Sequence, residues 1–109
     1  MPKKLPSEVI ELVADRFRVL AEPARLQILN TLMQGEWTVS DLVKETGLNQ
    51  ANLSKHLRIL RASGYVARRK EGLYAFYAIA DPSVGELCEI MCGRLEEQAE
   101  EQSTLLSGN

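Results

Sequence analysis

The sequence predicts a single, mainly α-helical domain that carries one small β-hairpin. The chain has 109 residues, a length that suits one hydrophobic core and is too short for two. Most of its apolar residues recur at the three- and four-residue spacing of helices. One stretch over 65–80 instead carries aromatic and strand-favouring residues on both sides of Glu71–Gly72, which is typical of a two-stranded hairpin.

Two helices are expected before residue 35. The first covers 7–21, with Ser7 as its N-cap and a wide apolar face. Pro23 favours the start of a second helix, because proline disfavours helix at the preceding residue and fits a first helical turn. Gly35 closes this second helix.

The next two helices form a helix-turn-helix pattern over 38–64. Thr38 caps a short helix that Gly47 ends, and Asn49 caps a longer helix that Gly64 ends. The apolar residues of the longer helix share one face: Leu53, Leu57 and Leu60. A short helix, a glycine-containing turn and a longer helix with a polar outer face are typical of this motif.

The hairpin over 65–80 follows directly, in the position of the wing of a winged helix. A last helix is expected over 83–101, and residues 102–109 are expected to fray. Its apolar stripe consists of Val84, Leu87, Cys88, Met91, Cys92 and Leu95. The predicted order is therefore α-α-α-α-β-β-α, a winged helix-turn-helix in one domain spanning 1–109.

Charge is distributed unevenly along the chain. The formal net charge is −2, but residues 49–72 carry six basic side chains against the single acid Glu71, or +5. Residues 73–109 carry Arg94 against seven acids, or −6. Charges act over only about 8–10 Å at physiological salt, so the local excess of basic residues is a better guide to the partner than the net charge. This local excess favours a nucleic-acid partner.

Several classes of function are excluded. No run reaches the roughly 18 apolar residues of a membrane helix, so no membrane partner is expected. Residues 1–6 lack the apolar segment of a secretory signal, so a reducing cytoplasm is expected. The sequence has no glycine-rich phosphate loop, metal–histidine motif or nucleophile with its base, so the protein is not expected to be an enzyme.

Several segments resemble the ArsR/SmtB family of winged-helix repressors. They are Thr38-Val39-Ser40-Asp41-Leu42, Gly47-Leu48-Asn49-Gln50-Ala51, Ser54-Lys55-His56-Leu57-Arg58-Ile59-Leu60 and Gly64-Tyr65-Val66, preceded by Leu20-Ala21-Glu22-Pro23-Ala24-Arg25-Leu26. The resemblance implies a homodimer built by helices 7–21 and 83–101. It also implies a repressor that binds a palindromic operator in double-stranded DNA and releases it when an inducer binds.

The sequence departs from the founding members of that family at both of their metal sites. The arsenic- and cadmium-sensing branch carries a motif similar to E-L-C-x-C-D-L in the third helix. At these positions this chain has Glu36-Trp37-Thr38-Val39-Ser40-Asp41-Leu42, which contains no thiolates. The zinc-sensing branch carries several histidines on its last helix, whereas this chain has one histidine, His56.

Polar side chains of the fourth helix and the hairpin are the candidate DNA contacts. The amides of Gln50 and Asn52 lie near the helix start, where they can pair with adenine in the major groove. The full set is Gln50, Asn52, Ser54, Lys55, His56, Arg58, Arg68, Arg69 and Lys70. His56 either donates to DNA or packs against the wing, and two of the three wing cations are expected to reach a phosphate. An apolar face here would instead indicate a protein-interaction module.

Cys88 and Cys92 lie one helical turn apart on the last helix. In a dimer of the family's type they could meet their counterparts, which gives up to four sulfurs. Three or four thiolates suit As(III), Cd(II) or Zn(II), and a disulfide or polysulfide bridge would make a thiol sensor. The remaining alternative is a regulator in which both cysteines only pack in the interface. No cofactor is required for DNA binding itself.

Overall fold

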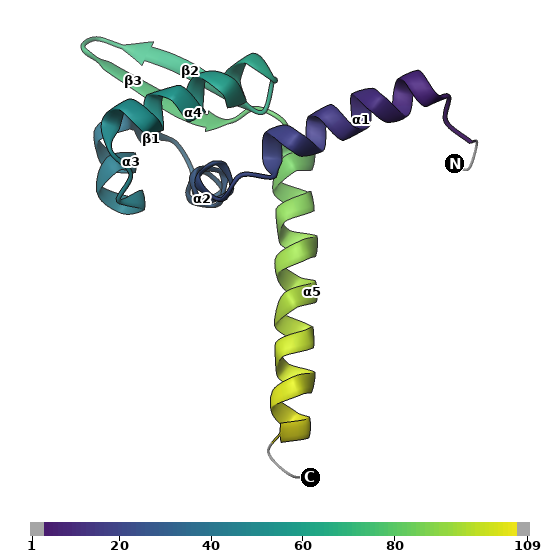
Figure 1. Ribbon diagram of the computed structural model, residues 1–109. Helices are drawn as coiled ribbons and strands as arrows, with labels where there is room; N and C mark the ends of the chain where they lie inside the picture. The colour runs from purple at the N-terminus through teal and green to yellow at the C-terminus, as the bar shows by residue number, and fades with distance from the viewer. Residues whose placement is uncertain (1–3, 107–109) are drawn as a thin grey trace.

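The computed structural model describes residues 4–106 and has the predicted winged helix-turn-helix order. The elements are α1 (Ser7–Leu20), α2 (Pro23–Leu32), β1 (Trp37–Thr38), α3 (Val39–Thr46), α4 (Gln50–Ala62), β2 (Val66–Glu71), β3 (Tyr74–Ile79) and α5 (Pro82–Leu106). Helices α2, α3 and α4 and the sheet form a body from which α1 and α5 extend in different directions (Figure 1). Within residues 4–106, no helix combines the length and apolar character that crossing a membrane requires.

The core lies between α2, α3, α4 and the sheet. The three leucines predicted to face inward from α4, Leu53, Leu57 and Leu60, are each at most 1% exposed, so that prediction is confirmed. They pack with buried apolar residues of the other elements, namely Ile28, Leu29, Leu42, Val66 and Val84. This packing fixes which face of α4 remains outside.

Two side-chain caps and one glycine set both ends of α3 and the start of α4. The Thr38 hydroxyl accepts a hydrogen bond from the Asp41 backbone N–H (3.2 Å), and the Asn49 side-chain oxygen accepts one from the Asn52 N–H (2.8 Å). Both predicted caps are confirmed. Between them Gly47 has φ +75°, a left-handed conformation that L-residues with side chains seldom adopt, and its N–H bonds to the Val43 carbonyl.

The sheet has three antiparallel strands in the order β1-β3-β2, one more than the sequence predicted. The added strand β1 pairs Trp37 with Tyr77 and Thr38 with Phe76. A strand of two residues is too short to show an alternating pattern, and Thr38 was already explained as a helix cap. The predicted hairpin forms around Gly72, whose φ of +60° suits the first central position of a two-residue turn.

The sequence-based prediction was wrong at both ends of the chain. Ser7 is the first residue within α1 and not its N-cap, because the carbonyl of Pro6 accepts the first helical bonds and no side chain caps the helix. Residues 102–106 were expected to fray, but they continue α5. Residues 94–106 contain no glycine or proline, and they are rich in glutamate and glutamine, which favour helices. Residues 107–109 lie outside the described part of the chain.

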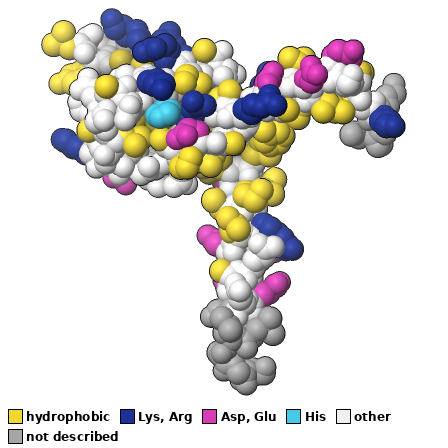
Figure 2. Space-filling view, viewed as in Figure 1, with side chains coloured by type: hydrophobic (Ala, Val, Ile, Leu, Met, Phe, Trp, Pro, Cys, Tyr) yellow, Lys and Arg dark blue, Asp and Glu magenta, His cyan; other side chains and the backbone are white. Residues whose placement is uncertain are grey.

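Helices α1 and α5 leave much of their apolar surface exposed. The radius of gyration is 17.1 Å, whereas a compact domain of this length has about 13 Å. Figure 2 shows hydrophobic side chains along both helices where they leave the body. The exposed residues are Val9, Ile10, Leu12, Val13 and Phe17 on α1, and Leu87, Ile90, Met91 and Leu95 on α5. Within the described chain, these side chains therefore have little apolar cover.

Candidate nucleic-acid interface

The outer face of α4 is polar and basic. Gln50, Asn52, Lys55 and Arg58 are exposed, and Ser54 is half-buried. The buried leucines hold the opposite face of the helix against the core, so these five predicted contacts share the solvent side. Lysine and arginine side chains gather over α4 and the adjoining hairpin (Figure 2). Cationic side chains and amide and hydroxyl side chains thus occur on one surface.

The three cations of β2 lie on two different faces of the sheet. Side chains alternate along a strand, so Arg68 and Lys70 lie on the face of buried Val66, and Arg69 lies on the other. All three cations are exposed. Within residues 4–106, Arg68 and Lys70 are absent from the ion pairs that form, whereas Arg69 takes part in two.

Arg69 is surrounded by carboxylates and an aromatic ring. Its guanidinium makes a bidentate contact with Glu36 (3.0 and 3.2 Å) and a third contact with Glu71 (2.6 Å), and it lies 4.8 Å from the centre of the Phe76 ring. The hydrogen bond from Arg69 lowers the pKa of the Glu36 carboxyl, and the two carboxylates raise the pKa of Arg69. The positive charge of Arg69 is therefore balanced within the protein, before any DNA is present.

His56 forms a hydrogen bond with α2. Its Nδ1 accepts a hydrogen bond from the Nε of Arg25 (3.2 Å), and Nη1 of Arg25 donates to the Val19 carbonyl at the end of α1 (3.1 Å). The imidazole is half-buried. Among the described residues no buried side-chain nitrogen or oxygen lacks a partner, and no partner is seen for Nε2 of His56. That nitrogen is therefore not fully buried.

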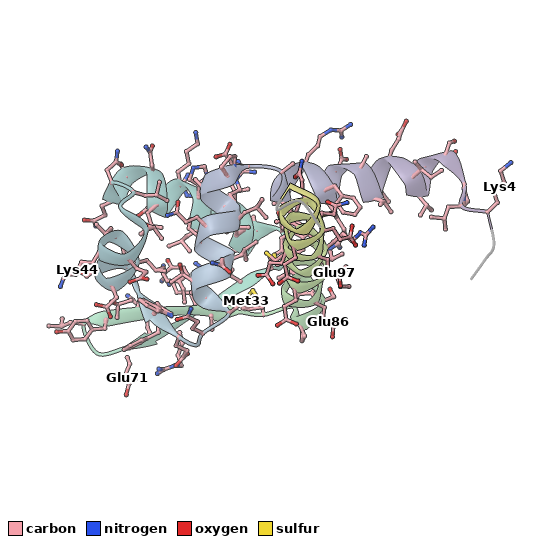
Figure 3. All side chains as sticks on the ribbon, turned by 90° about the horizontal axis from the view of Figure 1, so that it is seen from below. Lys4, Met33, Lys44, Glu71, Glu86 and Glu97 are labelled. Carbon is pink, nitrogen blue, oxygen red and sulfur yellow. The ribbon has the colours of Figure 1, made fainter. Side chains whose placement is uncertain are left out.

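The cysteines lie on α5, apart from the basic surface. Cys88 is half-buried, Cys92 is exposed, and both are free thiols. Partial burial and the neighbouring Cys92 raise the pKa of the Cys88 thiol. Within residues 4–106 one chain assembles no group of three metal-binding side chains. Figure 3 places Glu86 and Glu97 on the same helix, away from Lys44 and from Glu71 at the hairpin tip, so the acidic helix is separated from the basic face.

Two residues of this region were not identified from the sequence. Arg25 lies 31 residues before His56, and Glu36 lies 33 residues before Arg69, so local spacing gives no sign of either contact. Arg25 does belong to the segment 20–26 that carries a family resemblance, which was a signal that could have drawn attention to it.

Comparison with known proteins agrees with this geometry. A family model described as "Bacterial regulatory protein, arsR family" matches residues 22–68. The uncharacterized HTH-type transcriptional regulator Rv0081 of Mycobacterium tuberculosis H37Rv is 40% identical over 81 residues, which cover 73% of this chain and 71% of that protein.

Two solved structures of similar proteins add an assembly and an effector to this comparison. The first is the homodimeric winged helix-turn-helix DNA-binding domain of Mb0332 from Mycobacterium bovis, a possible ArsR-family regulator. It matches with a TM-score of 0.78 and 32% identity over 93% of this chain and 95% of that one. The second, the AntR antimony-specific transcriptional repressor, matches with a TM-score of 0.82 and 27% identity over 91% and 90% of the two chains.

Proposed function

This chain belongs to the ArsR family of bacterial DNA-binding transcriptional regulators, and from that premise we propose that it is a homodimeric repressor whose two α4 helices read a palindromic operator. The observation that carries the proposal is the polar and basic surface of α4 and the hairpin, opposite the leucine core. Two such surfaces related by a two-fold axis would fit half-sites about one helical turn apart.

The dimer is proposed to form through α1 and α5. These helices extend from the body and expose apolar side chains, including Phe17 (55% exposed) and Leu95 (58%). Burying such side chains yields roughly 25 cal/mol per Å² of apolar area, which favours a second copy as their cover. The similarity to the homodimeric Mb0332 domain supports the same arrangement here.

The residues of the basic surface are proposed to divide into two roles. Gln50 and Asn52, with Ser54 beside them, would contact base edges, because amides and hydroxyls at the start of a reading helix can bond bases in the major groove. The cations would contact phosphates, with His56 as a further donor; these cations are Lys55, Arg58, Arg68 and Lys70. Arg69 would act mainly on the hairpin itself, because Glu36 and Glu71 already balance its charge.

The two roles can be separated by fluorescence anisotropy on a selected operator and on a scrambled duplex. We expect Arg58→Ala to weaken binding to both DNAs and Gln50→Ala to weaken mainly the operator complex. Equal losses on both DNAs for Gln50→Ala would remove this residue from base reading. Unchanged binding in both variants would refute α4 as the reading helix.

We further propose that Cys88 and Cys92 of both subunits form the inducer site. Both thiols lie on the apolar stripe of α5 that the dimer is proposed to bury, and thiolates favour soft ions such as As(III), Cd(II) and, among borderline ions, Zn(II). The antimony-specific repressor AntR, similar in fold, supports a metalloid as the signal. An oxidant could act at the same thiols: a peroxide takes two electrons and two protons from a thiol pair, leaving a disulfide and two waters.

The inducer proposal is tested by comparing the reduced wild type with Cys88→Ser/Cys92→Ser on the same DNA. Arsenite, cadmium, zinc, hydrogen peroxide and a polysulfide donor are added separately. We expect at least one reagent to release DNA from the wild type and not from the double variant. If no reagent distinguishes the two proteins, the cysteines only pack in the interface, and the inducer proposal is refuted while the DNA-binding function stands.

A further inference from the structure

We propose that Arg25 is a positioning residue for DNA binding: it holds the imidazole of His56 in the tautomer whose Nε2–H can donate to DNA, and it connects that imidazole to the end of α1. The inference rests on the proposed function of α4 as the reading helix. It concerns the proton on His56, a feature that can be measured without DNA.

The hydrogen bond between Arg25 and His56 determines where the imidazole proton lies. Every guanidinium nitrogen of arginine is a donor and none can accept, so the Nε of Arg25, at 3.2 Å, needs an acceptor. Nδ1 of His56 can accept only if it carries no proton. A neutral imidazole then carries its proton on Nε2.

That proton is available to DNA. Nε2 is not fully buried, and His56 lies in α4 between the exposed cations Lys55 and Arg58. Phosphate oxygens only accept hydrogen bonds, so an Nε2–H suits them and an unprotonated Nε2 would oppose them. The tautomer therefore decides whether His56 attracts or repels the DNA backbone.

Arg25 also joins two helices that have different proposed tasks. Its Nη1 donates to the Val19 carbonyl in the last turn of α1, 3.1 Å away, while its Nε donates to His56 in α4. Helix α1 is proposed to pack against the second subunit, so a shift of α1 would act on this arginine. A lysine has one point charge in place of a planar fork and is not expected to hold both contacts.

The first test is the protonation of His56 in the free protein. His56 is the only histidine of the chain, so a ¹H–¹⁵N correlation spectrum of its ring contains one unambiguous residue. At a pH where the imidazole is neutral, we expect the wild type to carry the proton on Nε2 alone and Arg25→Met to show a mixture of tautomers. A proton on Nδ1 in the wild type, or an identical tautomer population in the variant, would overturn the proposal.

The second test asks whether Arg25 acts on DNA through His56. Gln at position 56 can offer an amide donor near the place of Nε2, without needing Arg25 to select a tautomer. We therefore expect Arg25→Met to weaken operator binding about tenfold in the wild-type background, the loss that two hydrogen bonds of about 0.7 kcal/mol each, one per subunit, would cause. We expect it to have little effect in a His56→Gln background. An equal loss in both backgrounds would show that Arg25 acts elsewhere, and would refute the positioning role.

Arg25→Lys controls for charge. It keeps the positive charge and is expected to lose DNA affinity without a change in the slope of log K against log salt. Full affinity in Arg25→Lys would show that charge alone matters, against the proposal. If the wild type bound no DNA, the repressor function would fail, whereas the tautomer measurement would still decide what Arg25 does to His56.

Discussion

The three cations of β2 differ in their partners, and we expect them to differ in DNA binding. Lys70 is exposed on the face of the hairpin that carries Arg68, whereas Arg69 is held by Glu36 and Glu71 on the other face. A cation already balanced by carboxylates displaces few counterions from DNA. Lys70→Ala should therefore reduce the electrostatic part of binding, and removal of the Arg69 pair should not.

The size of the effect follows from the symmetry of the dimer. Each phosphate contact contributes about 0.9 to the slope of log K against log salt, and a dimer presents Lys70 twice. Lys70→Ala should therefore flatten the slope by about 1.8. If the variant and the wild type bind equally at 1 M salt, this change of slope makes the variant roughly 60-fold weaker than the wild type at 0.1 M salt. Fluorescence anisotropy at several salt concentrations between these limits measures both quantities.

Two control variants make the result interpretable. Lys4→Ala removes the same charge from the same residue type in the segment before α1, far from the hairpin tip (Figure 3). Arg69→Ala/Glu36→Gln removes the ion pair without changing the net charge. Both should keep the wild-type slope. If either control flattened the slope as much as Lys70→Ala, the assignment of phosphate contacts on the hairpin would be refuted.

Three further outcomes are expected. Phe17→Asp places a charge on the exposed apolar face of α1 and should give a monomer in sedimentation velocity; a retained dimer would exclude α1 from the interface. Asn49→Ala removes the cap of α4 and should lower the free energy of unfolding, measured in urea, by about 1 kcal/mol. Asn49→Asp keeps a side-chain acceptor and should leave that free energy unchanged, so equal losses in the two variants would argue against the cap. Because burial and Cys92 raise the pKa of Cys88, its alkylation in the monomeric Phe17→Asp variant, followed by mass spectrometry, should reach half-maximal rate at a higher pH than that of an ordinary thiol. Cys92→Ser should lower that midpoint, and a midpoint at or below that of an ordinary thiol would contradict this expectation.

The fold could be predicted from the sequence because its signals are local. The caps at Thr38 and Asn49 and the glycines at 47 and 72 act within a few residues, and the leucine spacing of α4 defines its buried face. The strand β1 was missed because two residues carry no periodicity, and its partner lies about forty residues further along the chain. The N-cap of α1 was misplaced by one residue, since serine is a good cap and the preceding proline leaves no side-chain signal.

The candidate site was predictable as a surface and not as a set of contacts. Composition alone located the basic segment, and the alternation of β2 places Arg68 and Lys70 on one face and Arg69 on the other. That two of these three cations reach a phosphate stays a prediction. The sequence did not reveal that Glu36 would balance Arg69 or that Arg25 would hold His56. Both contacts join segments that only tertiary packing brings together. The two carboxylates beside Arg69 are the reason for proposing that this residue supports the hairpin, whereas the sequence predicted a DNA contact.

The most direct measurement of the central proposal is a hydroxyl-radical footprint of the reduced protein on DNA selected from a random library. A homodimer that presents two α4 helices predicts two symmetric protected segments, about 10–10.5 base pairs apart from centre to centre. Protection should be lost in Phe17→Asp at concentrations where the wild type is bound. A single protected segment, or no protection even at low salt, would contradict the proposal that this chain is a dimeric operator-binding repressor.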